Sequence, residues 1–339
     1  MRKINYGIIG VGIQGENHIR CLKNNPQVEL KAIADINKER ARNIVEKYKI
    51  RKWYEDYRKL LTDPEIEAVS ITTPDFLHKE IVIEAARCGK HILVEKPLAT
   101  SVKDAREIVN VSRASDVKLM VNFSNRWSPP FRHVKESIDK GELGEIFYAY
   151  ARLSDTIYVP TKMISWAHKT NVLWFLGSHV IDLLLWYFND EVIKVYGVSK
   201  SKVLNAKGVA TPDFYQAILE FKRGSVATVE CSWILPLTYP FIVDFKIEVV
   251  GSKGAVNVDR SHHGAVRKAD ERGYTYPDIL YLPHIGVPIF LYESINEFVK
   301  CVLEDKEPPI KVEDGLKNVI IIDAIMRSAT EGRAITLEY

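Results

Sequence analysis

The stretch Tyr6-Gly-Ile-Ile-Gly10-Val-Gly12-Ile-Gln-Gly15 lies near the start of the 339-residue chain and decides how its first part folds. Its apolar first half is typical of a buried strand, which runs directly into the spacing Gly-x-Gly-x-x-Gly. Residues Glu16 to Asn24 read as a helix, and a second strand from Leu30 ends in Asp35, about 20 residues after the last glycine. A glycine triplet between a strand and a helix, followed by that acid, is the fingerprint of a dinucleotide-binding βαβ unit.

Each position of this fingerprint has a physical task. Gly10 permits a tight turn, Gly12 lets the backbone approach a pyrophosphate, and Gly15 allows the helix to pack closely on the strand. The backbone amides near Ile13 and Gln14 are predicted to face the phosphates, with the helix dipole behind them.

The acid at the end of the second strand bears on which dinucleotide binds. Asp35 is predicted to accept hydrogen bonds from the adenosine ribose hydroxyls and to repel a 2′-phosphate, which favours NAD over NADP. Lys38 and Arg40 follow closely and could soften this discrimination, so NADP stays open as an alternative.

Strands and helices alternate through the first 122 residues. This rhythm predicts an α/β, doubly wound Rossmann domain over residues 1–122, with a parallel sheet. The strand that begins at Ala68 is stopped at Thr73-Pro74, on the sheet edge that also carries Gly10. His78 follows, and it is either a neighbour of the cofactor or a packing residue at the start of a helix.

A later strand, Ile92 to Val94, ends in Glu95-Lys96-Pro97, at the edge where an open parallel sheet places its ligand. Successive strand residues point to opposite faces, so if the strand continues this far Glu95 cannot simply neutralise Lys96 by pairing with it. Two ordinary charges at a solvated strand end are the alternative. The preceding fingerprint favours a functional role.

From residue 123 onward strands dominate, and several of them alternate cleanly between apolar and polar residues. We therefore predict a C-terminal α+β domain over residues 123–339, with a large open, mainly antiparallel sheet and helices on one face. A helix at about 313–330 is expected to pack back on the first domain. A sheet of this size has a second face to cover, which favours a homodimer or homotetramer through it.

The segment Val172 to Phe188 is apolar nearly all round and is predicted to be a buried helix. His179 and Asp182 are three positions apart on one face of it. They are either a satisfied pair in the core or a functional pair, in which Asp182 supports His179 by tuning or orienting it.

Bulk composition narrows the class of protein. The formal net charge is only +3, which gives no reason to expect nucleic acid as a partner, and no apolar run approaches the length of a bilayer span. The four cysteines lie far apart, without metal or redox spacing, so we expect free thiols in a cytoplasmic protein with no metal site.

These features together resemble a known family. They are the glycine fingerprint, Thr73-Pro74 with His78, Glu95-Lys96-Pro97, Arg126, and Gly177-Ser-His179-Val-Ile-Asp182. The combination is similar to the glucose–fructose oxidoreductase, inositol dehydrogenase and rhizopine-catabolism (Gfo/Idh/MocA) family, over essentially the whole chain.

The resemblance implies an NAD(P)-dependent dehydrogenase or reductase that acts on a CH–OH group of a sugar, sugar acid, cyclitol or sugar derivative. It implies that Lys96 lies beside the substrate hydroxyl, that Pro97 follows a cis peptide bond, and that His179 is the second catalytic group. Together with the fingerprint residues, the expected cofactor contacts are Thr73, Pro74, His78, Glu95, Lys96 and Arg126.

One position departs from the family pattern. Polyol dehydrogenases of the family usually carry an aspartate four residues before the histidine, where this chain has Phe175. Inositol itself becomes a weaker candidate substrate. Beside Lys96 and His179, the candidate substrate contacts are Asn122, Trp166, His168 and Asn171. Specificity is expected to lie in loops such as 156–171 and 274–288.

Oxidation of a carbinol requires a base for the hydroxyl proton. The favoured assignment is that His179 exchanges the proton while Lys96 polarises and positions the oxygen, and swapped roles are the close alternative. Two other functions stay open, namely a redox-neutral elimination or glycoside cleavage that uses bound NAD, and a non-catalytic NAD(H)-binding protein.

Overall fold

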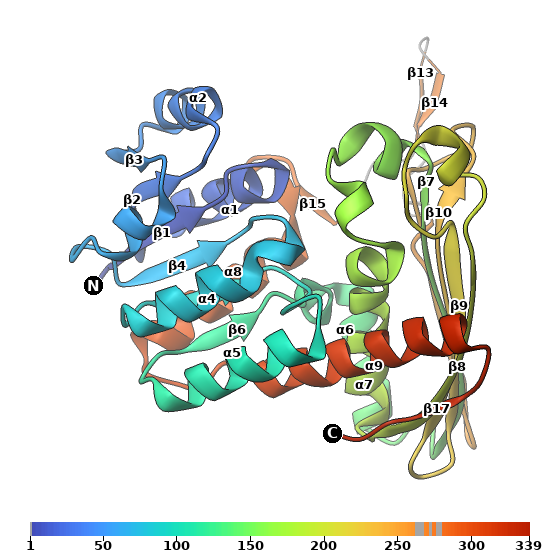
Figure 1. Ribbon diagram of the computed structural model, residues 1–339. Helices are drawn as coiled ribbons and strands as arrows, with labels where there is room; N and C mark the ends of the chain where they lie inside the picture. The colour runs from blue at the N-terminus through green and yellow to red at the C-terminus, as the bar shows by residue number, and fades with distance from the viewer. Residues whose placement is uncertain (1, 262–267, 271–272, 276–279) are drawn as a thin grey trace. The chain divides into compact units, whose positions relative to one another are not determined.

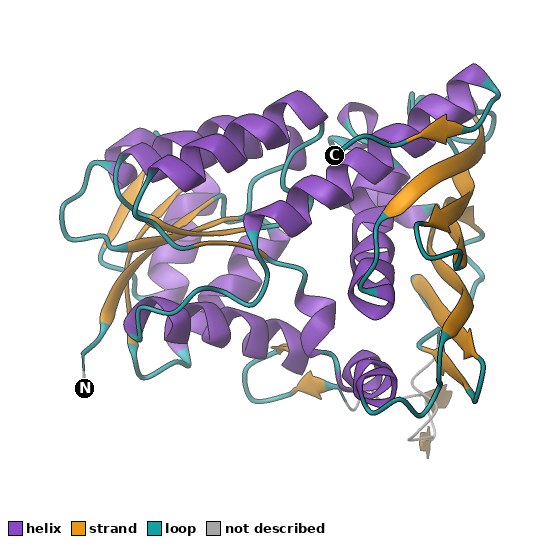
Figure 2. Ribbon diagram, turned by 90° about the horizontal axis from the view of Figure 1, so that it is seen from below, coloured by secondary structure: helices purple, strands orange, loops and turns teal. Residues whose placement is uncertain are grey.

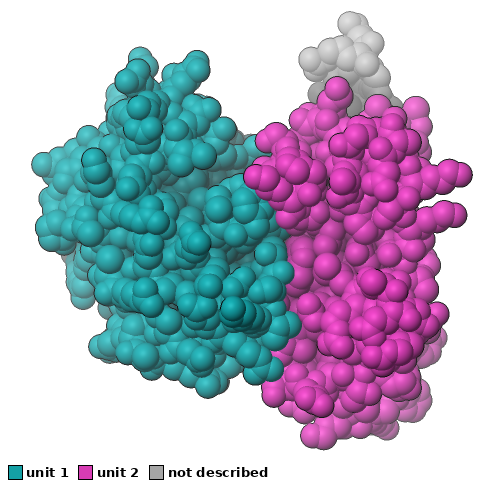
Figure 3. All heavy atoms as spheres, in the orientation of Figure 1, with its two compact units in different colours: residues 1–127, 280–316 teal, residues 128–279, 317–339 magenta. Residues whose placement is uncertain are grey.

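The computed structural model describes residues 2–261, 268–270, 273–275 and 280–339. The chain divides into two compact units, coloured separately in Figure 3. Unit 1 comprises residues 1–127 and 280–316, and unit 2 comprises residues 128–279 and 317–339. The sequence suggested a boundary after residue 122, whereas the first segment of unit 1 runs to Trp127, and the sequence did not reveal that residues 280–316 belong to the same unit.

Unit 1 is built on a six-stranded sheet in the order β3-β2-β1-β4-β5-β6, with every neighbouring pair parallel (Figure 1). This is the strand order of a Rossmann fold. Successive strands are added toward one edge of the sheet from β1 to β3 and toward the other edge from β4 to β6, so the order reverses between β1 and β4. Its strands are β1 (Ile4–Ile9), β2 (Val28–Ala34), β3 (Lys52–Tyr54), β4 (Ala68–Ile71), β5 (His91–Val94) and β6 (Leu119–Val121).

Helices cover both faces of this sheet (Figure 2). Helix α1 packs with α8 and α4 packs with α5. The helices of unit 1 are α1 (Ile13–Lys23), α2 (Lys38–Tyr48), α3 (Tyr57–Leu61), α4 (His78–Arg87), α5 (Val102–Ala114) and α8 (Ile289–Leu303), with short turns η1 (Asp75–Leu77) and η2 (Ser124–Trp127). Short strands β15 (Tyr281–Leu282) and β16 (Val287–Pro288) precede α8.

Polar contacts explain why α8 belongs to unit 1. Asn25 donates to Asn296 over 2.8 Å, and Ser294 donates to Asn122 over 2.6 Å in a buried site. Arg20 also donates to the carbonyl of Gly286 over 3.0 Å. These bonds join residues that are far apart in the sequence, which is why no local pattern predicted them.

Unit 2 contains a seven-stranded sheet in the order β12-β11-β7-β10-β9-β8-β17. All neighbouring pairs are antiparallel except β7 with β10, which confirms the predicted mainly antiparallel sheet. The strands are β7 (Ile146–Thr156), β8 (Val192–Lys200), β9 (Phe214–Phe221), β10 (Val226–Leu235), β11 (Val243–Gly251), β12 (Ala255–Asp259) and β17 (Ile335–Thr336). A separate hairpin pairs β13 (Lys268–Asp270) with β14 (Gly273–Thr275), and residues 276–279 of the predicted specificity loop lie outside the described residues.

Helix α7 (Ser178–Phe188) packs on β7 and β10 and next to α6 (Pro129–Asp139). Helix α9 (Val312–Glu331) begins in unit 1 and ends in unit 2. Shorter segments are η3 (Val159–Met163), η4 (Ala167–Lys169), η5 (Leu173–Gly177) and η6 (Asn205–Lys207), of which η3 and η5 have π-helical hydrogen bonding. In the described part of the chain, no helix combines the length and the apolar character that crossing a bilayer requires.

Candidate active site

The glycine loop joins β1 to α1 in the geometry that its sequence predicts. Gly10 has a φ of +86°, and its N–H donates to the carbonyl of Ala34 over 2.8 Å. A Cβ on Gly15 would lie 2.1 Å from the carbonyl oxygen of Gly10, so no other residue fits there. A Cβ on Gly12 would meet nothing within 4 Å, which leaves open space beside the first amides of α1.

Asp35 lies at the end of β2 and braces this loop. Its Oδ2 accepts from the N–H of Val11 over 2.8 Å, and its Oδ1 accepts from the N–H of Asn37, also over 2.8 Å. The guanidinium of Arg40 lies 3.4 Å from Oδ2, so the cation that could accommodate a 2′-phosphate is paired with the acid. Ile36, the next residue, is 85% exposed.

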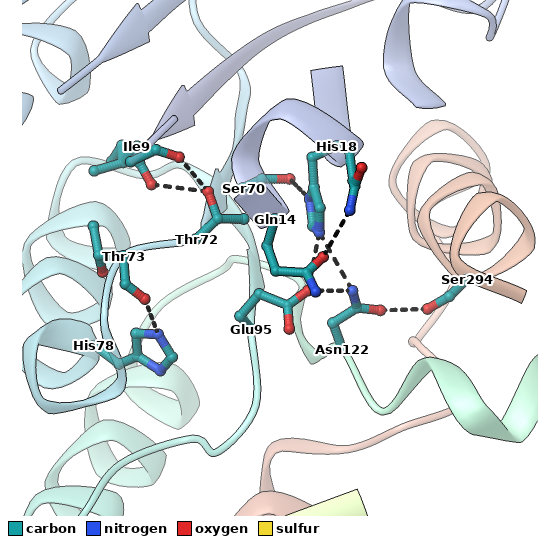
Figure 4. Close-up of polar contacts among 12 residues, drawn as sticks. Ile9, Gln14, His18, Ser70, Thr72, Thr73, His78, Glu95, Asn122 and Ser294 are labelled. Atoms are coloured by element: carbon teal, nitrogen blue, oxygen red, sulfur yellow. Dashed lines mark hydrogen bonds and ion pairs between the residues drawn. The ribbon is translucent and has the colours of Figure 1, made fainter. Parts of the chain in front are cut away.

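The loop after β4 is held by its own threonines and by His78 (Figure 4). The hydroxyl of Thr72 donates to the carbonyl of Gly10 over 2.5 Å, while the hydroxyl of Thr73 is buried without a hydrogen-bond partner in the described residues. The buried ring of His78 places Nε2 3.0 Å from the Thr73 carbonyl and Nδ1 2.7 Å from the Pro97 carbonyl.

Because both ring nitrogens of His78 contact the backbone, the packing interpretation of this residue is favoured over direct cofactor contact. Burial lowers the pKa of His78, while its carbonyl partners and the charge of Asp75 oppose that shift. The ring ties the loop after β4 to the turn after β5.

That turn carries Glu95, Lys96 and Pro97, and the Lys96–Pro97 peptide bond is cis, as the family resemblance implied. Lys96 is partly exposed, whereas Glu95 is only 8% exposed. Oε1 of Glu95 accepts from His18 Nε2 over 3.0 Å and from Asn122 Nδ2 over 2.7 Å (Figure 4).

Glu95 is ionised despite its burial. Burial alone would raise the pKa of this carboxyl group, but the hydrogen bond and charge of His18 above all, with the charge of Lys96 and the amide of Asn122, lower it to about 2. The turn therefore places a fixed negative charge directly before the lysine.

Asn122, a predicted substrate contact, is held by hydrogen bonds inside unit 1. Its side chain is 1% exposed, its Nδ2 is used by Glu95, and its Oδ1 accepts from Ser294 over 2.6 Å. Both ends of the amide are occupied inside unit 1, which argues against the predicted contact with substrate. Asn122 instead holds Glu95.

Arg126, predicted as a cofactor contact, lies in η2 with little exposure. Its guanidinium is 3.6 Å from the carboxylate of Asp314, at the start of α9. The predicted cofactor contact is not tested by this pair and stays a prediction.

In unit 2, the predicted continuous helix is divided in two. Residues Leu173–Gly177 form a π-helical segment, and α7 follows from Ser178. Phe175 and His179 are both partly exposed in a segment whose other residues up to Leu184 are buried. Asp182 is buried at 2% exposure. The pKa of Tyr187 is raised, first by the burial of its own hydroxyl and second by the charge of Asp182.

Asn171 caps the π-helical segment. Its Oδ1 accepts from the N–H groups of Leu173 and Trp174 over 2.9 Å and 3.1 Å, and its Nδ2 lies 3.5 Å from the sulfur of Met326. The amide of this buried side chain is thus used within the fold, which argues against its predicted contact with substrate. π-helical turns are rare and are found frequently at functional sites.

The other two predicted substrate contacts of this region differ from each other in exposure. His168 is exposed on η4, and Trp166 is partly exposed just before it. The ring of Trp166 meets Phe175 edge-on at 6.1 Å, and Phe175 lies 5.6 Å from the ring of Trp233.

Trp233 was not singled out by the sequence. It is fully buried on β10, and its indole N–H has no hydrogen-bond partner among the described residues. The alternation of Ala227, Val229, Cys231 and Trp233 along the strand places all four on the face toward η5, and this pattern was available in the sequence. We call Trp166, Phe175 and Trp233 the aromatic cluster.

The residues of unit 1 fit a bound dinucleotide. The open space at Gly12, the unpartnered hydroxyl of Thr73 and the acid at the end of β2 lie along the carboxyl edge of the parallel sheet, where this fold binds its ligand. In the described residues, no group of three or more His, Cys, Asp and Glu side chains could hold a metal ion.

Comparison with known proteins agrees with this geometry. The family model described as "Oxidoreductase family, NAD-binding Rossmann fold" (GFO/IDH/MocA) matches residues 4–123, and the model for the "C-terminal alpha/beta domain" of that family matches residues 135–337. A similar curated protein is myo-inositol 2-dehydrogenase of Thermotoga maritima, which is 28% identical over 333 residues, 98% of each chain.

Two solved structures are also similar. Levoglucosan dehydrogenase in complex with NADH and levoglucosan has a TM-score of 0.85 at 25% identity, and covers 99% of this chain and 100% of that one. Myo-inositol 2-dehydrogenase of Lactobacillus plantarum has a TM-score of 0.88 at 23% identity with the same coverage, and this likeness concerns the fold alone.

Proposed function

This chain belongs to the GFO/IDH/MocA oxidoreductase family, and on that premise we propose that it interconverts a carbinol and a carbonyl of a sugar-like substrate with NAD. The observation that carries the proposal is the turn after β5. It offers an amine, Lys96, directly after an ionised and buried carboxylate, Glu95, at the ligand-binding edge of a Rossmann sheet.

NAD, when bound, supplies the acceptor for the hydride. The amides at the start of α1 would hold its pyrophosphate, and Asp35 would accept from its ribose hydroxyls. The pairing of Arg40 with Asp35 supports NAD rather than NADP, because the cation is not left available to a 2′-phosphate.

Two groups of the protein handle the substrate oxygen and its proton. An imidazole titrates near neutral pH, so we assign the proton exchange to His179. The amine of Lys96 donates a hydrogen bond to the carbinol oxygen and fixes its position. The reverse assignment is the alternative that mutants of each residue decide.

The substrate proposed is a sugar or cyclitol that presents a face of C–H groups to Trp166 and Phe175, the partly exposed members of the aromatic cluster. Phe175 stands four positions before His179, so this position carries an aromatic ring, packed on Trp166 and Trp233, and not a carboxylate. Aromatic faces bind the apolar side of a sugar ring, whereas a carboxylate binds its hydroxyls. This favours an anhydro or deoxy sugar over a fully hydroxylated inositol.

A substrate panel tests the proposed function. Sugars, anhydro sugars, sugar acids and inositols are incubated with NAD or NADP, and nicotinamide absorbance is followed. A steady absorbance change with one class supports the proposal and excludes a redox-neutral reaction as the sole chemistry. Product formed without net absorbance change supports the redox-neutral alternative, and NADH binding without any product supports a non-catalytic NAD(H)-binding protein.

We also propose that the outer face of the unit 2 sheet joins copies of this chain into a dimer or tetramer. Tyr196 on β8 pairs with Ile218 on β9, and each is 46% exposed, with Tyr148 and Val198 exposed on the same face. Such a patch favours a protein partner. Ile218→Glu should lower the molar mass measured by light scattering, and an unchanged mass would count against this face.

The four free cysteines support a cytoplasmic location.

A further inference from the structure

A hydrogen-bonded chain runs through the interior of unit 1 and ends at Glu95 (Figure 4). Tyr6 lies 3.1 Å from the hydroxyl of Ser70, which lies 2.9 Å from Nδ1 of His18. Nε2 of His18 then lies 3.0 Å from Oε1 of Glu95. The side chain of His18 is fully buried, so its ring serves the protein interior and no ligand.

The directions of these bonds are consistent from end to end. The carboxylate of Glu95 can only accept, so Nε2 of His18 donates to it, as does Nδ2 of Asn122. Nδ1 of His18 lies beside the hydroxyl of Ser70, which lies beside the hydroxyl of Tyr6, and each hydroxyl can donate or accept as its neighbour requires. Every member has the partner that its chemistry requires, and satisfied buried networks of this kind rigidify what they connect.

Apolar side chains in place of this network would avoid the free-energy cost of desolvating its polar groups. Burying a carboxylate and an imidazole costs desolvation, and apolar residues of similar volume in place of both partners often serve stability equally well. The network is therefore weak evidence for stability and calls for another role. Its placement supplies one, because it connects the two functional segments of unit 1.

Helix α1 links these segments. Its first turn carries the amides of Ile13 and Gln14 that face the pyrophosphate in the proposed function, and one turn later it carries His18. A helix of 11 residues moves as a unit, so the position of its N-terminus also fixes the His18 ring. That ring holds Glu95, the residue before Lys96.

We infer that His18 is a positioning residue, which holds the Glu95–Lys96 turn in its working place and ties it to the helix that binds the dinucleotide. The inference rests on the proposed function, because it concerns how Lys96 is presented to substrate. His18 touches neither substrate nor cofactor and acts through Glu95.

Three variants test this inference in the full chain. His18→Asn keeps a polar atom near Nδ1, beside Ser70, but has no atom that reaches Glu95. His18→Gln places its amide near Nε2 and can donate to Glu95. The control is Tyr6→Phe, which removes a buried hydroxyl of the same network while leaving the bond between His18 and Glu95 intact.

With the substrate that the panel identifies, His18→Asn should lower kcat about tenfold or more with little change in KM, because the turn is misplaced and not lost. His18→Gln should recover most of that loss. Tyr6→Phe should keep kcat within about threefold of the parent even where its melting temperature falls. The melting temperature of each variant identifies any that does not fold.

The inference is overturned if folded His18→Asn turns over at the parent rate, or if Tyr6→Phe and His18→Gln lose as much kcat as His18→Asn does. NADH titration by fluorescence separates this failure from that of the proposed function. If the parent turns over no substrate, the proposed function fails. The inference is then judged by binding, where His18→Asn should weaken the NADH dissociation constant about threefold or more and Tyr6→Phe should leave it unchanged.

Discussion

The two groups proposed to act on the substrate, Lys96 and His179, have contrasting surroundings. Around Lys96 the structure is polar and closed, since Glu95 is held from two sides and His78 binds the carbonyl of Pro97. Around His179 it is aromatic and irregular, with a π-helical turn before it and Phe175 packed between two tryptophans. The first arrangement leaves little freedom to change, because a substitution there leaves a buried polar group unpaired, whereas the rings of the second meet through aromatic contacts.

This contrast suggests that the residues around Lys96 control the reaction, whereas those around His179 control substrate specificity. The unit 1 residues are fixed by hydrogen bonds whose loss leaves buried polar groups unpaired, so substitutions there should affect the reaction or the fold. The aromatic cluster is held by packing, so substitutions there should change which substrate is preferred.

The largest expected effect comes from removing either acting group. Lys96→Ala and His179→Ala should each lower kcat by about 10²- to 10³-fold, because each removes a group that acts on the reacting oxygen or its proton. Steady-state rates and NADH titrations measure the effect, and the dissociation constant of NADH should stay near that of the parent. Lys103→Ala, at an exposed lysine of α5, is the control. A parent rate in either mutant would remove that residue from the mechanism.

The next effect concerns stability at acid pH. The pKa of Glu95 is lowered to about 2, so its contribution is fully present above its unfolded pKa of about 4.3 and is lost as the pH falls toward 2. Glu95→Gln should lower the free energy of unfolding by about 3 kcal/mol at pH 7 and should flatten its decline between pH 5 and pH 2. Urea unfolding at several pH values measures this.

The exposed carboxylate of Glu29 provides the comparison for that experiment. Its pKa is lowered by the hydrogen bond from Lys31, but solvent screens the pair. Glu29→Gln should therefore leave the curve almost unchanged. Equal acid dependence in the parent and in Glu95→Gln would show that the network does not hold Glu95 ionised.

A third change tests the choice of coenzyme. Asp35→Ser removes the charge that repels a 2′-phosphate and releases Arg40 to bind one. The ratio of kcat/KM for NADP to that for NAD should rise about 10²-fold, equivalent to roughly 2.7 kcal/mol. Adding Arg40→Ala should reverse much of the gain. If the double mutant keeps all of it, Arg40 has no part in the discrimination.

The smallest expected effect concerns substrate preference, and it tests directly whether the aromatic ring near His179 sets specificity. Phe175→Asp places a carboxylate one turn before His179 and should raise the kcat/KM for inositols relative to anhydro sugars by about tenfold. The substrate panel measures the ratio, and Phe175→Leu serves as an apolar control that should leave inositols disfavoured. A rise with Phe175→Leu equal to that with Phe175→Asp would attribute the effect to space and not to charge.

The sequence allowed the unit 1 edge to be predicted well because its signals are local. Glycines at fixed spacing, an acid at a strand end and a Glu-Lys-Pro turn each specify their own backbone within a few residues. The hydrogen bonds of His18 and Asn122 to Glu95 were not predicted, because they join residues that are 77 and 27 positions apart. The π-helical turn was missed because the apolar pattern of 172–188 is equally compatible with an α-helix.

The sequence by itself determined the order of strands and helices, the Rossmann class of the first unit and the sheet of the second, because hydrophobic periodicity and turn residues act over short distances. Only the tertiary structure decided that residues 280–316 join the first unit, that Asn122 serves Glu95, and that Phe175 belongs to an aromatic cluster. The physical reason is that burial and hydrogen-bond partners arise between segments far apart in the chain, and no short pattern records which segments will meet.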